Sequence, residues 1–158
     1  MTSPLKIGVV GVGHLGKEHA RIYRDLPEAT LVGISDQDPA KAEKARELGT
    51  TYYQDPRELI GKVEAVSIAT PTSTHYAVAK EFLKAGIHTL IEKPITLNLA
   101  EADELLALAR QKHCALQVGH IERHNPGFKR IEEIAGNIRF FECHRLGPFT
   151  GRINDCGV

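Results

Sequence analysis

The sequence predicts an α/β fold, a doubly wound parallel sheet covered by helices on both faces. Two observations lead to this prediction. Apolar runs of strand length alternate with amphipathic stretches through residues 5–136, the order typical of a parallel sheet with crossover helices. The first apolar run then breaks into Gly11-x-Gly13-x-x-Gly16 and a helical pattern. A chain of 158 residues has the length of one ordinary domain, and we expect that domain over 1–136.

The glycine motif has the spacing of a phosphate-binding turn. Gly11 would make the tight turn from strand to helix, and Gly13 would let the backbone approach a pyrophosphate closely. Gly16 would let the following helix, expected over 14–24, pack on the first strand. The free N–H groups and positive dipole end of that helix would point at the pyrophosphate. The sequence therefore predicts a Rossmann-type nucleotide site.

A second apolar run, 30–35, ends on Asp36, which lies 20 residues beyond the third glycine. An acid at this place accepts hydrogen bonds from both ribose hydroxyls of NAD and repels the 2′-phosphate of NADP. The alternative is that Asp36 only caps a turn. Asp38, followed by Pro39, is the better cap for a helix over 39–48 and leaves Asp36 free for a ligand. NAD is the expected cofactor, and NADP is less expected.

Capping signals mark the next elements. Gly49 is a natural left-handed end for the second helix. The run 55–58 combines an N-cap, a proline at the first helical position and an acid that bonds back, which predicts a brief helix to residue 60. The threonines and serine of 72–74 can cap a helix over 75–84. Strands are expected over 51–53, 65–70, 88–91 and 115–118.

Two further helices follow. Asn98 with Glu101 forms a capping pair for a helix to residue 111, and Asn125-Pro126 opens a helix that ends near Gly136. Apolar residues recur at helical spacing in the longer helix and are expected in the core: Leu99, Ala102, Leu105, Leu106 and Ala109.

The last segment does not fit a closed domain. Residues 138–145 have a strand pattern rich in bulky side chains, and no partner element follows them. Because an exposed apolar strand edge invites pairing or aggregation, we expect 137–158 to begin a second, incomplete α/β domain of a truncated chain. The alternative is an added edge strand on the first sheet.

Composition excludes several classes of protein. Lys and Arg together equal Asp and Glu at 20 each, so no nucleic-acid or anionic-membrane partner is expected. The cysteines, Cys114, Cys143 and Cys156, are odd in number and far apart, which favours a reducing cytosol. No metal site is expected, since neighbouring His and Cys residues on a strand point to opposite faces. No apolar run can span a bilayer and no secretion signal is present, so we expect a cytoplasmic protein.

Further motifs complete a pattern. The 65–70 run ends in Ala69-Thr70-Pro71, Glu92-Lys93-Pro94 follows the 88–91 run, and 119–126 reads GHIERHNP. With the glycine turn and Asp36, the sequence resembles the glucose-fructose oxidoreductase/inositol dehydrogenase (Gfo/Idh/MocA) family over essentially its whole length. The closing 142–148 resembles the first substrate-domain strand of members acting on UDP-N-acetyl sugars.

The resemblance implies a two-domain NAD(P)-dependent dehydrogenase that acts on a hydroxyl of a sugar, cyclitol or sugar nucleotide. The C-terminal domain of such proteins carries the substrate pocket, the dimer interface and a catalytic histidine. We expect a homo-oligomer through that domain, and we expect this chain, which stops at Val158, to lack the histidine.

The resemblance also implies site residues. Lys93, expected to be partly buried, would stabilise a developing alkoxide and join a proton relay; the alternative is a solvated surface lysine. Lys93, His120 and Arg123 would face the substrate, although a histidine such as His120 is more often structural than catalytic. Glu92 would contact the nicotinamide ribose. The expected cofactor-binding residues are Gly11, Gly13, His14, Leu15, Gly16, Asp36, Thr70, Pro71, Thr72, His75, Glu92 and Lys93.

Two of those residues carry alternatives. Thr72 replaces the asparagine common in the family, which weakens a side-chain contact there, and His75 can equally cap its helix. Two other functions also stay open. One is a non-catalytic NAD-binding module that binds nucleotide or a partner chain through Phe140-Phe141. The other is methyl transfer from S-adenosylmethionine, against which Glu92-Lys93-Pro94 argues.

Overall fold

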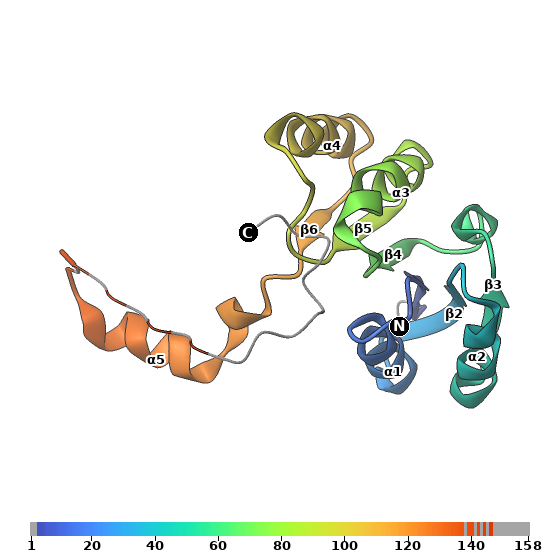
Figure 1. The fold of residues 1–158 in the computed structure, drawn as a ribbon, viewed down its shortest axis with the longest axis horizontal. Coiled ribbons are helices and arrows are strands. Elements are labelled where there is room, and N and C mark those ends of the chain that lie inside the picture. The colour runs from blue at the N-terminus through green and yellow to red at the C-terminus, as the bar shows by residue number, and fades with distance from the viewer. Residues whose placement is uncertain (1–2, 138, 141, 143, 145, 147–158) are drawn as a thin grey trace. The chain divides into compact units, whose positions relative to one another are not determined.

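A computed structural model describes residues 3–137, 139–140, 142, 144 and 146 (Figure 1). The chain divides into two compact units, Met1–Gly119 and His120–Val158. The strands of the first unit are β1 (Leu5–Val10), β2 (Ala29–Ser35), β3 (Thr51–Tyr53), β4 (Ala65–Ile68), β5 (His88–Ile91) and β6 (Leu116–Val118). Its helices are α1 (Gly16–Asp25), η1 (Pro39–Lys41), α2 (Ala42–Leu48), η2 (Pro56–Leu59), α3 (Thr72–Lys84) and α4 (Leu99–Gln111). The second unit holds η3 (Ile121–His124) and α5 (Pro126–Ala135).

The six strands form one sheet in the order β3-β2-β1-β4-β5-β6, and every neighbouring pair is parallel. The chain therefore winds outward from β1 to β3, returns, and winds outward again from β4 to β6. The two directions part between β1 and β4, which is where ligands bind in open sheets of this kind. The predicted doubly wound fold class is confirmed.

Each face of the sheet has its own apolar cluster. Val9 of β1 packs with Ala20 of α1 and Ala45 of α2 on one face, while Val10 packs with Phe82 of α3 and Leu105 of α4 on the other. Neighbouring strand residues point to opposite faces, so a short apolar strand supplies both clusters at once. Figure 1 shows α1 and α2 grouped apart from α3 and α4.

Local capping signals hold in the structure. The Asp38 side chain accepts from the N–H of Ala40 at the start of η1, and Gly49 ends α2 with a φ of 66°. Asn98 accepts from the N–H of Glu101, and Asn125 accepts from the N–H of Gly127. These bonds involve residues two or three positions apart, which is why the sequence pattern predicts them.

Some local expectations were wrong. The helix expected over 75–84 begins at Thr72, directly after Pro71, and no side chain caps it. β4 ends at Ile68, two residues earlier than the strand expected over 65–70. The helix follows Pro71 at once, so Thr74 is already helical and its hydroxyl donates to the Pro71 carbonyl. In α4, Leu99 is 83% exposed and Leu106 is 41% exposed. α4 buries Leu105 and Ala109 fully and Ala102 and Leu108 in part, while Leu99 and Leu106 stay at the surface.

The strand expected over 138–145 lies partly outside the described residues. Its residues Arg139, Phe140, Glu142 and His144 are described and are not in a strand. Ile138, Phe141, Cys143 and Arg145 are among those outside. The second domain expected over 137–158 therefore stays a prediction. Among the described helices, none is both long and apolar enough to cross a membrane.

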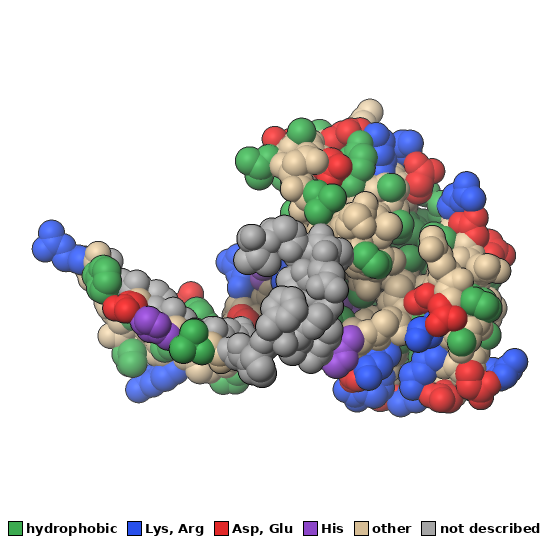
Figure 2. All heavy atoms as spheres, in the orientation of Figure 1, with side chains coloured by type: hydrophobic (Ala, Val, Ile, Leu, Met, Phe, Trp, Pro, Cys, Tyr) green, Lys and Arg blue, Asp and Glu red, His purple; other side chains and the backbone are tan. Residues whose placement is uncertain are grey.

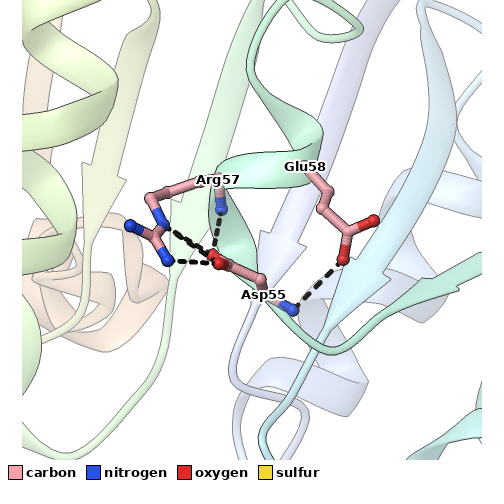
Figure 3. Close-up of polar contacts among 3 residues, drawn as sticks. All are labelled: Asp55, Arg57 and Glu58. Atoms are coloured by element: carbon pink, nitrogen blue, oxygen red, sulfur yellow. Dashed lines mark hydrogen bonds and ion pairs between the residues drawn. The ribbon is translucent and has the colours of Figure 1, made fainter.

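The start of η2 carries a capping box (Figure 3). Asp55 accepts from the N–H of Arg57, and Glu58 accepts from the N–H of Asp55. Asp55→Ala removes the cap and should lower the Tm by about 2–4 °C. Asp55→Asn keeps the cap and loses only an exposed ion pair with Arg57, so its Tm should stay near that of the wild type. Equal losses in both variants, measured by thermal melting, would contradict the capping role.

Candidate functional site

The turn between β1 and α1 has three glycines with different surroundings. Gly11 has a φ of +81°, and a Cβ there would lie 2.8 Å from the carbonyl carbon of Ala69. A Cβ on Gly16 would lie 1.8 Å from the carbonyl oxygen of Gly11. A Cβ on Gly13 would meet nothing within 4 Å. Packing thus requires Gly11 and Gly16, whereas Gly13 faces open space that a ligand can enter.

The same turn carries the backbone N–H groups of residues 12–15, and among the described residues only the first of them has an acceptor. The N–H of Val12 donates to Oδ2 of Asp36 at 2.8 Å. Within the described residues, the N–H groups of Gly13, His14 and Leu15 have no backbone or side-chain acceptor. No side chain caps the start of α1, and His14 and Leu15 are exposed. Free donors at a helix N-terminus fit an anionic group such as a pyrophosphate.

Asp36 lies at the carboxyl end of β2 and is more constrained than expected. Its Oδ1 accepts from the N–H of Asp38 at 3.0 Å, so it takes part in a turn in addition to holding Val12. Asp38 caps η1 as predicted, but the Asp36 carboxylate also accepts from the N–H groups of Val12 and Asp38, so its contact with a ligand stays a prediction. Each carboxylate oxygen can still accept a second hydrogen bond, which is the capacity that ribose hydroxyls need.

Tyr52 of β3 supports Asp36, which sequence reasoning missed. The Tyr52 hydroxyl donates to the backbone carbonyl of Asp36 at 2.7 Å. Burial, followed by the charges of Asp36 and Asp38, raises the pKa of the Tyr52 phenol, so the phenol stays a neutral donor at physiological pH. A tyrosine in the next strand carries no local signal that points to Asp36.

His75 in the first turn of α3 neither caps its helix nor faces solvent. It is 1% exposed, and its ring nitrogens lie 2.8 Å from the Thr70 carbonyl and 2.9 Å from the Pro94 carbonyl. Of the two alternatives for His75, the capping role is wrong, because the ring points inward between two loops, and the contact with the cofactor stays a prediction. His75 thus joins the segment after β4 to the segment after β5. Thr72, one turn earlier, is buried as well, and Pro71 is exposed.

Glu92 and Lys93 follow β5 and differ in burial. Glu92 is 6% exposed; its Oε1 lies 3.2 Å from Nε2 of His19, and its Oε2 accepts from the N–H of Lys93 at 3.1 Å. Lys93 itself is exposed. The expected partial burial of Lys93 was wrong for this unit, because the chain leaves the sheet at this point and no element of Met1–Gly119 covers the side chain. Sequence reasoning missed His19, although it follows Gly16 by three residues, on the same face of α1.

The expected cofactor residues therefore converge in the first unit. They follow β1, β2, β4 and β5, whose carboxyl ends lie along one edge of the parallel sheet. His120 and Arg123 belong to the second unit, where they line an exposed hollow with Glu122, Phe128 and Glu132. Their contact with a substrate stays a prediction. No cluster of three metal-ligating side chains occurs among the described residues.

A glycine turn with free N–H groups, an acid after the second strand and a lysine at the same sheet edge define a dinucleotide-binding domain of the dehydrogenase class. The chain belongs to the oxidoreductase family with an NAD-binding Rossmann fold, whose model matches residues 5–120. This confirms the Gfo/Idh/MocA resemblance, and NAD is the cofactor of this domain.

Individual relatives agree. UDP-N-acetylglucosamine 3-dehydrogenase of Acidithiobacillus ferrooxidans is 42% identical over 98% of this chain and 49% of its own length. Myo-inositol 2-dehydrogenase of Thermotoga maritima is 34% identical over 90% of the chain and 44% of its own. The solved structure of GenD2 from gentamicin A biosynthesis, in complex with NAD, matches with a TM-score of 0.82 at 30% identity over 87% of this chain and 40% of that one. The chain thus spans about half the length of the relatives it matches.

Proposed function

We propose that the chain is the nucleotide-binding part of an NAD-dependent dehydrogenase that acts on a hydroxyl of a sugar, cyclitol or sugar nucleotide. The observation that carries this proposal is the open space and free N–H groups at Gly13, beside the carboxylate of Asp36. The identity of 42% with a UDP-N-acetylglucosamine 3-dehydrogenase over nearly the whole chain favours a UDP-N-acetyl sugar as the substrate.

Each group in the site has a proposed task. The turn N–H groups bind the pyrophosphate, Asp36 accepts from the adenosine ribose hydroxyls, and Glu92 accepts from the nicotinamide ribose. NAD, when bound, supplies the hydride acceptor. The segment Thr70-Pro71-Thr72, whose Thr70 carbonyl is bound by His75, lines the nicotinamide side, and His14 and Leu15 pack over the cofactor.

The chemical step requires a group that stabilises negative charge on the substrate oxygen. Lys93 is proposed for this role, because its ammonium is exposed at the carboxyl end of β5, where a hydroxyl can reach it. His120 and Arg123 are proposed to face the substrate. A proton acceptor from a C-terminal domain, as the family resemblance implies, would complete the relay.

The proposal extends to partners and place. We propose a homo-oligomer formed through a C-terminal domain, in the cytoplasm, with neither nucleic acid nor membrane as a partner. Figure 2 shows basic and acidic side chains intermixed on the visible face, in agreement with the equal totals of 20 each. Such a surface attracts polyanions weakly.

Separate titrations of NADH and NADPH into the chain test the proposal. The chain has no tryptophan, so nicotinamide fluorescence is read against little protein emission. We expect NADH to bind in the micromolar range and NADPH at least about tenfold more weakly, because Asp36 repels a 2′-phosphate. A folded chain, shown by circular dichroism, that binds neither nucleotide would contradict the proposal. Competition by S-adenosylmethionine would favour methyl transfer instead.

A second candidate is a non-catalytic NAD-binding module. The observation in its favour is that every expected cofactor-binding residue lies in the first unit, Met1–Gly119. An assay with NAD and UDP-N-acetylglucosamine separates the two candidates. NADH formation supports the dehydrogenase, while NADH binding without turnover supports the module.

A further inference from the structure

Two side chains, one from α1 and one from β4, form a chain of contacts that ends at Glu92. His19 of α1 places Nδ1 2.6 Å from the hydroxyl oxygen of Ser67 in β4 and Nε2 3.2 Å from Oε1 of Glu92. Ser67 is fully buried, the Glu92 side chain is 7% exposed and that of His19 is 16% exposed. A histidine from the helix after the glycine turn thus reaches the residue that precedes Lys93.

One arrangement of protons satisfies this group completely. The Ser67 hydroxyl donates to Nδ1, the protonated Nε2 donates to Oε1 of Glu92, and the N–H of Lys93 donates to Oε2. An ionised carboxylate accepts only, and a neutral imidazole has one donor and one acceptor, so the chain of donors runs in one direction. In this arrangement Nε2 of His19 donates and Nδ1 accepts.

The order Ser-His-Glu is also that of nucleophilic triads, but the geometry excludes that chemistry. Ser67 lies within the central strand β4 with no exposed surface, so no substrate carbonyl can reach its hydroxyl. Ser67 and His19 therefore act by holding the carboxylate of Glu92, the outermost of the three side chains.

The backbone at Gly119 also lies against the Glu92 carboxylate. Gly119 is buried after β6, and a Cβ on it would lie 2.6 Å from Oε1 and 2.9 Å from the carboxyl carbon of Glu92. The Glu92 carboxylate thus contacts His19 and the backbone N–H of Lys93, and Gly119 lies close against its Oε1. These three neighbours restrict the position of the Glu92 carboxylate.

From this geometry we infer that His19 is a positioning residue of the proposed dehydrogenase site. It holds the Glu92 carboxylate, and through Glu92 the backbone at Lys93, where the nicotinamide ribose and the substrate hydroxyl would lie. The inference rests on the proposed function. It links the nucleotide helix α1 to the catalytic end of β5 by a side chain that touches neither substrate nor cofactor.

Two substitutions at His19 each keep one of its two contacts and remove the other. The amide nitrogen of glutamine reaches about as far as Nε2, whereas the amide of asparagine reaches about as far as Nδ1. His19→Gln keeps the donor to Glu92, and His19→Asn keeps the contact with Ser67. The probes are NADH and ADP, because ADP lacks the nicotinamide ribose. Arg21→Ala, which removes an exposed ion pair with Glu18 on the same helix, is the control.

We expect His19→Asn to bind NADH about tenfold more weakly, the loss of one hydrogen bond to a charged group, and ADP within about twofold of the wild type. His19→Gln should retain NADH binding within about threefold, and Arg21→Ala should change neither affinity. Parallel losses of NADH and ADP in both His19 variants, or no loss in His19→Asn, would overturn the inference while leaving the proposed function intact. A folded wild-type chain that binds neither ligand would overturn the proposed function, and this inference with it.

Gly119→Ala tests the same carboxylate without altering α1. Its Cβ would displace Oε1 of Glu92, so NADH binding should weaken about tenfold while ADP binding is kept. This variant decides the question where a His19 substitution prevents folding. Unchanged NADH binding by folded Gly119→Ala would overturn the inference.

Discussion

Gly16→Ala should destabilise the chain severely, whereas Gly13→Ala should leave stability unchanged and weaken NADH binding at least about tenfold. A Cβ at Gly16 would lie 1.8 Å from the backbone oxygen of Gly11, and backbone cannot move aside as a flexible side chain can. Overpacking of this kind costs about 3 kcal/mol, which lowers the Tm by about 6–12 °C for a chain of this size. Thermal melting followed by circular dichroism measures this loss.

Gly13→Ala is the matched variant. A methyl group there meets nothing within 4 Å in the protein, so the Tm should stay within about 2 °C of the wild type. The same methyl group would stand where the proposed pyrophosphate approaches, so NADH affinity should fall at least about tenfold. Wild-type NADH affinity in Gly13→Ala would place the pyrophosphate elsewhere.

Asp36→Ala should weaken NADH binding by about 1–3 kcal/mol and reduce the preference for NADH over NADPH. The substitution removes the proposed ribose acceptor and the charge that repels a 2′-phosphate. It also strands the N–H of Val12, which Asp36 holds at 2.8 Å within the glycine turn. Fluorescence titrations with both nucleotides measure the affinity and the preference.

Two variants separate those effects. Asp36→Asn keeps an acceptor oxygen for Val12 but loses the charge, so it should lose nucleotide preference more than NADH affinity. Asp38→Ala removes the cap of η1 and should lower the Tm with no change in preference. An unchanged affinity and preference in Asp36→Ala would contradict the assignment of Asp36 to the ribose.

Much of the fold follows from signals that act over a few residues. The 88–91 run predicts β5 with its observed bounds, and 51–53 predicts β3. The start of α3 at Thr72 was missed, since a threonine and serine cluster is as typical of a cap as of a first helical turn. Leu99 was assigned to the core by spacing alone, which does not show how wide a stripe a neighbouring helix covers.

The site was predicted as a set of positions. The spacing of the glycines, Asp36 after the second strand and Glu92-Lys93-Pro94 after the fifth each carried a local pattern, so these residues were named in advance. Their mutual support was not predicted. No local sequence pattern predicts the contact of Tyr52 with Asp36 or that of Gly119 with Glu92. The same holds for His75, which lies between Thr70 and Pro94.

The sequence by itself determined the alternation of strands and helices, the capped helix starts and the family, because these depend on residues within one turn or on a motif. Tertiary structure alone decided that Asp36 holds the glycine turn, 24 residues away from it at Val12, and that His19 reaches Ser67 across 48 residues and continues to Glu92. Those contacts depend on β1 lying between β2 and β4, and strand order is set by how the whole sheet buries its two faces.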